Sequence, residues 1–436
     1  MPLYRDPQND NLYHVQKVQT CSGHPLEVTT ASGTNVYVQP AGVAGDAFGR
    51  LRTSNPYTLF DSSHRYSTNG NWSTATGVSG TVVFNANQGL VDLKVGTNSG
   101  SSVYRETSRV FSYQPGKSLL SMSTFVMSSG QTNLRQRIGY FSSGNGIYFQ
   151  QSGSTYSIVE RSSVSGSVSE TIVPQADWNG DKLNGNGESA ITLDPTKSQI
   201  FWTDIEWLGV GTVRTGFVIN GQFIICHSFH HANLVPNTYI TTASLPVRYE
   251  IEALNTLTTS GTLKQICSTV ISEGGYEARG NSNSINLALS APRICTNSGT
   301  YYPVTAIRLK ADRLDAIAVP NGLSLIGDGT NAIFSWRIVK NATVSGGTWT
   351  SAGTNSPVEY NISGTSVSSG EVLTAGYFAA DAQGKNVVEL VTADFFKYQL
   401  ERNSFTATPA QFIVEVAARS DNDKVWASLD WEEIAK

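Results

Sequence analysis

Two carboxylates lie close together in the most apolar part of the chain, Asp204 and Glu206 in the segment WTDIEW at 202–207. Residues two apart on a strand project from the same side, about 7 Å from each other. Hydrolysis of a glycosidic bond uses two carboxylates at a comparable separation, one as the acid and the other as nucleophile or base. The simpler interpretation is a pair that is hydrogen-bonded or faces solvent and has no catalytic role.

Three histidines and a cysteine follow in the same apolar run, Cys226, His227, His230 and His231. On one strand, His227 and His231 would share a face but would lie about 13 Å apart. Counting residues outward from the next turn places the cation Arg214 across from His227, which disfavours a bound metal. We therefore expect no metal here unless symmetry brings several copies together.

The segment DWNGDKLNGNGE at 177–188 matches a calcium-binding loop in part. Asp177, Asn179, Asp181 and Glu188 hold the first, third, fifth and twelfth positions of the calcium pattern. Lys182 stands where that pattern needs glycine, and neither flank is predicted to be helical. We expect a surface loop of turn-forming residues, with weak calcium binding as the alternative and no other cofactor.

Aromatic residues recur between positions 140 and 156, and Tyr140, Tyr148 and Tyr156 could stack on sugars if their rings were exposed. Aromatic side chains in strands are more often part of a core. These three tyrosines are candidate glycan-binding residues under the less common alternative.

The candidate residues must be positioned by the segment from Ser198 to His231, which predicts three consecutive antiparallel strands. Asn220-Gly221 is a strong hairpin signal, because a type I′ turn needs a positive φ at both central residues. A two-residue loop places Val218 opposite Phe223 and Thr215 opposite Cys226. Large apolar groups on both faces indicate a strand pair that is covered on both sides.

The composition predicts an all-β protein. Of the 436 residues 39% are hydrophobic, only 15% are charged, and 40 are glycine. Such a chain favours strands and turns over surface helices, which prefer charged and other helix-forming residues.

Nucleic acid and membrane insertion are not expected. The formal net charge is −4, no run of Lys or Arg occurs, and no apolar stretch of about 18 residues is present. The first residues, MPLYRDPQNDNLYHVQ, lack an apolar signal segment, so we expect a soluble protein made without a standard export signal. The four cysteines show no CxxC spacing, so we expect them to be reduced and structural.

Three regions follow from turn spacing. Residues 1–71 are predicted to be an N-terminal arm and an ordered connector, 72–290 a jelly-roll β-sandwich, and 291–436 a smaller C-terminal β-sandwich. Near the end, the polar turn Asp421–Asp423 is expected to join the strands Gln411–Ala418 and Lys424–Asp430 as a hairpin.

Three stretches resemble structural proteins of tailed bacteriophage virions: AFGRLRTSNPYTLFDS at 47–62, residues 180–234, and TPAQFIVEVAARSDNDKVWASLDWEEI at 408–434. The resemblance implies a particle component in the tail, neck, baseplate, fibre or head decoration. It also implies assembly in the host cytoplasm, with other virion proteins and further copies of the chain as partners. The central stretch is also similar to the concanavalin-like jelly roll.

The segment WTDIEW resembles the ExDxE strand of jelly-roll glycosidases, in which the first Glu is the nucleophile and the last is the acid/base. Trp202 stands at the nucleophile position here, so the resemblance implies that retaining hydrolysis is lost. We therefore expect the chain not to be an enzyme. The alternative function is a receptor-binding, lectin-like module that recognises host-surface glycans.

Assembly contacts are expected from the segment Asp46–Tyr66, whose apolar residues fit neither a helical nor a strand period. Residues 1–45 have no apolar face long enough to form a core, so we expect this arm to pack on its own body or on a neighbouring subunit. The candidate assembly residues are Phe48, Arg50, Leu51, Arg52, Tyr57 and Phe60.

Overall fold

The computed structural model describes residues 3–5, 12–14, 55–277, 280–328, 332–380, 386–389 and 399–435. The chain divides into two units, residues 1–53 and 54–436. In the first unit, β1 (Leu3–Arg5) pairs with β2 (Leu12–His14) in an antiparallel hairpin. Within the described residues, no helix has the length and hydropathy needed to span a membrane.

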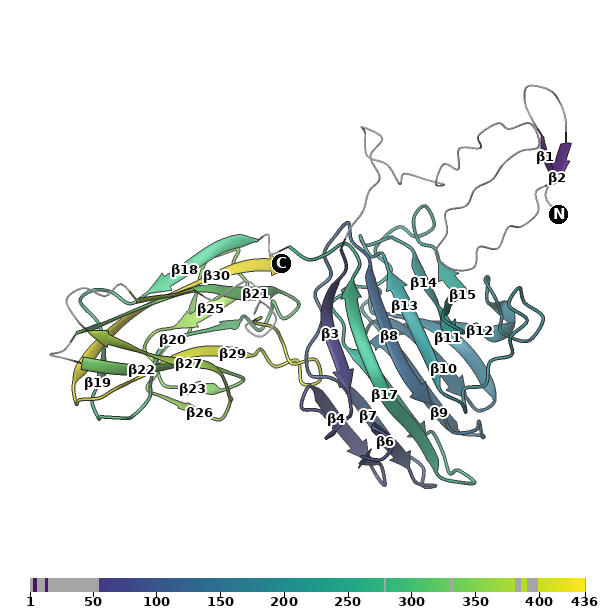
Figure 1. Ribbon diagram of the computed structural model, residues 1–436, viewed down its shortest axis with the longest axis horizontal. Helices are drawn as coiled ribbons and strands as arrows, with labels where there is room; N and C mark the ends of the chain where they lie inside the picture. Colours follow the sequence, from purple (N-terminus) through teal and green to yellow (C-terminus); the bar gives the residue numbers. More distant parts are fainter. Residues whose placement is uncertain are drawn as a thin grey trace. The chain divides into compact units, whose positions relative to one another are not determined.

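Two packed antiparallel sheets form the first β-sandwich of the second unit (Figure 1). The seven-stranded sheet has the order β12 (Ser169–Pro174), β11 (Thr155–Ser162), β10 (Gly146–Ser152), β9 (Leu134–Phe141), β16 (Val247–Ala253), β7 (Ser102–Thr107), β4 (Trp72–Gly77). The eight-stranded sheet has the order β15 (Gln222–Phe229), β14 (Val213–Ile219), β13 (Gln199–Ile205), β8 (Leu119–Val126), β17 (Gly261–Ser272), β6 (Leu90–Val95), β5 (Thr81–Asn85), with β3 (Tyr57–Ser63) also paired to β17. The chain crosses repeatedly between the two sheets, as a jelly roll does.

The core of this sandwich is aromatic at its centre. Phe149 of β10 makes an edge contact with Phe217 of β14, with ring centroids 5.2 Å apart. Phe217 lies 5.5 Å from Phe201 of β13, and all three rings are buried. Because successive side chains on a strand alternate between faces, these contacts assign the faces of β13 and β14.

A second sandwich follows (Figure 1). Its five-stranded sheet contains β18 (Asn281–Asn286), β30 (Asp423–Ala435), β21 (Ile317–Asp328) and β28 (Asn386–Glu389), with β19 (Arg293–Cys295) on β30. Its six-stranded sheet has the order β24 (Thr350–Ser351), β25 (Val358–Asn361), β20 (Tyr302–Leu309), β29 (Gln411–Ala418), β22 (Ala332–Lys340), β27 (Glu371–Ala380). The strands β23 (Thr343–Ser345) and β26 (Ser366–Ser368) form a separate pair.

The predicted fold class, an all-β protein with a jelly-roll sandwich and a smaller C-terminal sandwich, is confirmed. The last strand of the first sandwich is β17, which ends at Ser272. The next strand, β18, already belongs to the second sandwich, because it pairs with β30. The predicted boundary was residue 290. The segment Tyr57–Ser63, expected to be irregular, is strand β3; a bulge between Val270 and Ile271 of β17 interrupts its register.

The hairpin predicted at Asp421–Asp423 is wrong. Asn422 does adopt a positive φ of 66°. However, β29 belongs to the six-stranded sheet and β30 to the five-stranded sheet, so the turn connects the two layers. The apolar pattern of both strands suits either arrangement, because an inward-facing strand has the same alternation in both sheets.

The turn predicted at Asn220-Gly221 is confirmed, with φ values of 54° and 74°. Val218 lies opposite Phe223, as predicted. Further from the turn the predicted register is wrong, because a β-bulge between Thr215 and Gly216 places Thr215 opposite His227. Arg214 then faces Ser228. A bulge inserts one extra residue on one strand and shifts every later pair.

The hairpin turn provides a test of backbone strain. An added Cβ at Gly221 meets nothing within 4 Å, so only its positive φ opposes a side chain. We expect Gly221→Ala to lower the free energy of unfolding by about 1 kcal/mol, measured by urea denaturation. Gly70 is the matched control, because its added Cβ also meets nothing and its φ is outside the left-handed region. Equal effects of the two substitutions would contradict the strain argument.

Candidate functional site

The segment WTDIEW directs its polar side chains to the outer face of the eight-stranded sheet. Phe201 and Ile205 of β13 are buried in the sandwich core. Trp202 and Asp204 alternate with them and therefore project from the opposite face. Trp202 is only 3% exposed, and its ring lies 5.4 Å from that of Phe223, which is 54% exposed. The face thus presents the ring of Phe223, packed on the buried Trp202, together with a carboxylate.

Asp204 is engaged by the strand beside it. It lies directly opposite Arg214 of β14, and the Arg214 Nε donates to Asp204 Oδ2 over 3.2 Å, with a second bond from Nη2 to the same oxygen. The other carboxylate oxygen, Oδ1, is buried and has no hydrogen-bond partner in the described structure. Burial raises the pKa of Glu273, and the negative charge of Asp204 raises it further.

Glu206 lies beyond the end of the strand, which stops at Ile205. The chain turns here through positive φ values of 40° at Leu208 and 79° at Gly209. The Glu206 N–H donates to the Thr212 carbonyl over 3.1 Å, which closes the loop. The prediction that both carboxylates share one strand face assumed a strand that continued through Glu206. A cavity of about 490 Å³ nevertheless has both in its lining, which consists of Gly116, Lys117, Ser118, Asp204, Glu206, Thr212 and Arg214.

The three histidines have separate partners. His227 Nδ1 accepts from the Asn179 N–H over 3.3 Å, and His230 Nδ1 lies 3.3 Å from the Thr212 hydroxyl. His231 contacts Glu160, on the other sheet. Among the described residues, no group of three or more His, Cys, Asp or Glu side chains is arranged to hold a metal ion.

His231 joins the two sheets of the first sandwich. Its Nε2 lies 2.8 Å from Glu160 Oε2 on β11, and its Nδ1 lies 2.6 Å from the Gly211 carbonyl. The ring stacks on Tyr239 with centroids 3.9 Å apart. Both ring nitrogens face acceptors, so the doubly protonated imidazolium satisfies both. Burial alone would lower the pKa of His231, but the bonds to Glu160 and Gly211 outweigh it and raise the pKa above its ordinary value.

This contact predicts a pH-dependent stability. The folded-state pKa of His231 lies above the unfolded value of about 6.5. The stability that this contact contributes is therefore complete below about pH 6.5 and is lost as the pH rises through the folded-state pKa. We expect His231→Gln to lower the free energy of unfolding by roughly 1–3 kcal/mol at the acid end of a series from about pH 5.5 to pH 9, and by less at the alkaline end.

The neighbouring His230→Gln is the control, because His230 is exposed. The readout is the difference between variant and parent at each pH. This difference cancels the opposite contributions of His64 and His227, whose pKa values burial lowers. A difference that is constant across the series would contradict the charged His231–Glu160 contact.

The predicted calcium loop covers the edge of β15. The N–H groups of Gly180 and Asp181 donate to the carbonyls of Cys226 and Ile225, each over 2.9 Å. The Asn179 side chain exchanges two bonds of 2.8 Å with the backbone of Ser228. The loop therefore continues the sheet past its last strand and leaves that part of the edge paired.

The four predicted calcium ligands are placed differently within this loop. Asp181 accepts from the backbone N–H groups of Leu183 and Ser189 over 2.8 and 2.7 Å, and these bonds lower its pKa against the effect of burial. Asn179 binds β15, whereas Asp177 ends the 3₁₀ turn Gln175–Asp177. Glu188 is exposed further along the loop. Calcium binding here stays a prediction.

Two of the three candidate glycan tyrosines have no exposed ring, which corrects the prediction that they could stack on sugars. Tyr140 is buried in the core, where its hydroxyl donates to backbone carbonyls and burial raises its pKa. Tyr148 faces outward from the seven-stranded sheet, but the Arg161 guanidinium lies over its ring at 5.0 Å. Burial raises the pKa of Tyr148 to about 12. Tyr156 is half-buried and packs on Phe149.

A buried network of ion pairs on the seven-stranded sheet was missed. Arg137 lies 2.5 Å from Glu250 and 2.6 Å from Glu252, and Arg248 lies 2.6 Å from Glu106. Glu106 and Glu250 are only 1% exposed. The sequence pattern that could have predicted this network is the alternation of charged residues at 135–137 and 248–252. Pairing of β9 with β16 brings their opposite charges together.

The candidate assembly residues fall into two groups. Phe48, Arg50, Leu51 and Arg52 lie outside the described residues. Phe60 and Tyr57 are on β3 and pack within their own chain. Phe60 is 5.1 Å from Phe111 and 6.0 Å from Trp72, and Tyr57 is 6.2 Å from Tyr276, measured between ring centroids.

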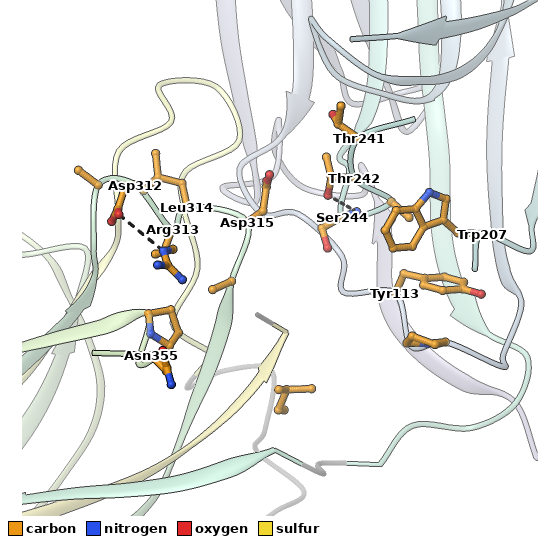
Figure 2. Close-up of a pocket in the computed structure, with 16 residues that line it drawn as sticks. Tyr113, Trp207, Thr241, Thr242, Ser244, Asp312, Arg313, Leu314, Asp315 and Asn355 are labelled. Atoms are coloured by element: carbon orange, nitrogen blue, oxygen red, sulfur yellow. Dashed lines mark hydrogen bonds and ion pairs between the residues drawn. The ribbon is translucent and has the colours of Figure 1, made fainter. Parts of the chain in front are cut away.

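Sequence reasoning also missed a cavity of about 630 Å³ (Figure 2). Tyr113 and Trp207 meet edge to face in its lining, with centroids 5.9 Å apart. Figure 2 shows Thr242 and Ser244 beside them, where the Ser244 N–H donates to the Thr242 hydroxyl over 3.1 Å. The lining also includes residues 311–316. These residues come from loops far apart in the sequence, so no local pattern could have identified them.

No protein-family model and no curated protein sequence matches the chain. Solved structures resemble about half of it. The carbohydrate recognition domain of Emp47p is 10% identical with a TM-score of 0.32, over 51% of this chain and 97% of that one. A glycosyl hydrolase family 16 protein from Mycobacterium smegmatis is 8% identical with a TM-score of 0.35, over 49% and 100%. Arcelin-5, a lectin-like defence protein from Phaseolus vulgaris, is 8% identical with a TM-score of 0.30, over 50% and 99%. Scores this low carry no argument about ligand or activity.

Proposed function

We propose that the chain is a non-enzymatic structural component of a tailed-phage virion. The sequence stretches 47–62, 180–234 and 408–434 resemble structural proteins of such particles. The component assembles through its β domains and its N-terminal segment with further copies of itself and with other virion proteins. Its place is the tail, neck, baseplate, fibre or head decoration.

The surroundings of Asp204 carry the non-enzymatic part of this proposal. Retaining glycoside hydrolysis needs a nucleophilic carboxylate and an acid/base carboxylate facing one bond. Here Trp202 occupies the first position of the pattern, and Arg214 holds Asp204 in an ion pair. Glu206 has left the strand for the loop that closes on Thr212. The arrangement suits binding by a mixed-charge surface better than a two-carboxylate reaction.

The virion proposal is tested on particles of the phage that encodes the chain. We expect the chain to co-purify with infectious particles through a density gradient at a fixed copy number per particle, measured by quantitative mass spectrometry. Antibody labelling in electron micrographs should mark one particle region. A chain that is abundant in the infected-cell lysate and absent from purified particles would contradict the proposal.

Glycan recognition is the second candidate function, and one observation favours it. The exposed ring of Phe223 packs on the buried Trp202, on the same sheet face as Asp204 and Arg214. An exposed aromatic ring near a few hydrogen-bonding groups suits a small polar ligand. The exposed Arg214 guanidinium supplies donors for a sugar hydroxyl.

A glycan array probed with the full chain tests this candidate. If glycans bind here, Phe223→Ala should weaken binding at least about tenfold, which corresponds to about 1.4 kcal/mol. Ile172→Ala is the matched control, because Ile172 is 50% exposed on β12 of the other sheet. An array that stays blank with and without calcium would exclude the glycans it displays, and equal binding by both variants would exclude this face.

A further inference from the structure

Among the described residues, no strand pairs with the outer edge of β27, the strand at one end of the six-stranded sheet. β27 runs for ten residues, and within the described part of the chain its one paired neighbour is β22. An edge strand presents a row of backbone N–H and C=O groups that only another extended chain can pair in full. This requirement identifies the occupant as a β-strand.

Three other edges of the two sandwiches are short, covered or protected. The edge of β15 is paired by the loop at Asn179–Asp181, as described above. At the opposite end of the six-stranded sheet, β24 is only two residues long. The edge strand β12 ends in Pro174, which lacks a backbone donor, and carries the charged Glu170. Most of β27, residues 372–380, has neither a charge nor a proline, and its one charged residue, Glu371, stands at its start.

The sequence of β27 favours pairing with an identical strand. The run VLTAGYFAA at 372–380 contains no charge and no proline. Two antiparallel copies related by a two-fold axis therefore bring no like charges together, which is the usual obstacle to self-pairing. Tyr377 is 80% exposed and Val372 is 49% exposed, so the strand carries apolar surface that a second copy would cover.

The register of such a pair follows from the geometry of β27. A bulge between Ile338 and Val339 of β22 interrupts the pairing near Val372, so the regular part of β27 is Thr374–Ala380. The centre of this regular part is Tyr377. A two-fold axis at this point places Tyr377 opposite the partner's Tyr377 and Gly376 opposite the partner's Phe378. Aromatic pairs across strands stabilise a sheet.

We propose that β27 pairs antiparallel with β27 of a second copy of the chain, centred on Tyr377, and joins two six-stranded sheets into one continuous sheet. The contact is isologous, so it closes after two copies and does not propagate. It requires no phage particle and does not depend on the proposed virion role.

Sedimentation velocity on the full chain at increasing concentration tests the pairing. We expect a monomer–dimer equilibrium in the parent chain. Tyr377→Lys should weaken self-association at least about tenfold, because it places two lysines opposite each other at the axis. At concentrations where both chains are monomeric its thermal unfolding should match that of the parent, since the Tyr377 side chain is 80% exposed. Tyr66→Lys is the matched control, because Tyr66 is 90% exposed on the first sandwich, and it should dimerise like the parent.

Cross-linking tests the register. In a Cys21→Ser, Cys267→Ser background, Tyr377→Cys should form a disulfide-linked dimer on mild oxidation, because the axis brings the residue to its own copy. Ala379→Cys should not, since the proposed register places it opposite the partner's Ala375. A parent chain that stays monomeric at all concentrations, an oligomer that Tyr377→Lys leaves intact, or equal cross-linking by both cysteine variants would each overturn the proposal.

Discussion

Backbone pairing at the sheet edges is the constraint on which this structure depends. Both sandwiches are built from antiparallel strands, and each outermost strand has N–H and C=O groups that need partners or protection. The loop at 177–188, rich in Asn, Gly and Asp, meets this need for β15 through the Asn179 side chain and two backbone bonds. The same residues resemble a calcium loop in sequence because turns and calcium sites both use short oxygen-bearing side chains.

The two sheets of the first sandwich differ in how their charged side chains are paired. On the seven-stranded sheet, Arg137, Glu250 and Glu252 are almost buried and satisfy one another. Removing one member of such a network would leave an uncompensated charge, so these residues restrict the sequence of β9 and β16 as strongly as core residues do. On the eight-stranded sheet, Arg214 pairs with Asp204, and the buried second carboxylate oxygen of Asp204 has no hydrogen-bond partner among the described residues.

The loop that carries Glu206 is linked to the opposite sheet. Gly211 in this loop accepts a bond from His231, which also binds Glu160 of β11. The protonation state of His231 is therefore coupled to the position of this loop, which lies beside the cavity that has Asp204 and Glu206 in its lining. Since Tyr239 stacks on the same ring, the imidazolium is enclosed on one face by an aromatic surface.

The sequence by itself determined the local features. Low charge and regular turns predicted the all-β class, and Asn220-Gly221 determined a type I′ hairpin, because few residues other than Gly and Asn adopt a positive φ without strain. Tertiary structure decided everything that depends on which strands become neighbours. It separated β29 from β30 into different sheets, shifted the register at Thr215 through a bulge, and buried Tyr148 beneath Arg161. It also brought Glu160 to His231 across 71 residues. A strand's alternation specifies one covered face and one open face, but it does not specify the partner, and the environment of each candidate residue follows from the partner.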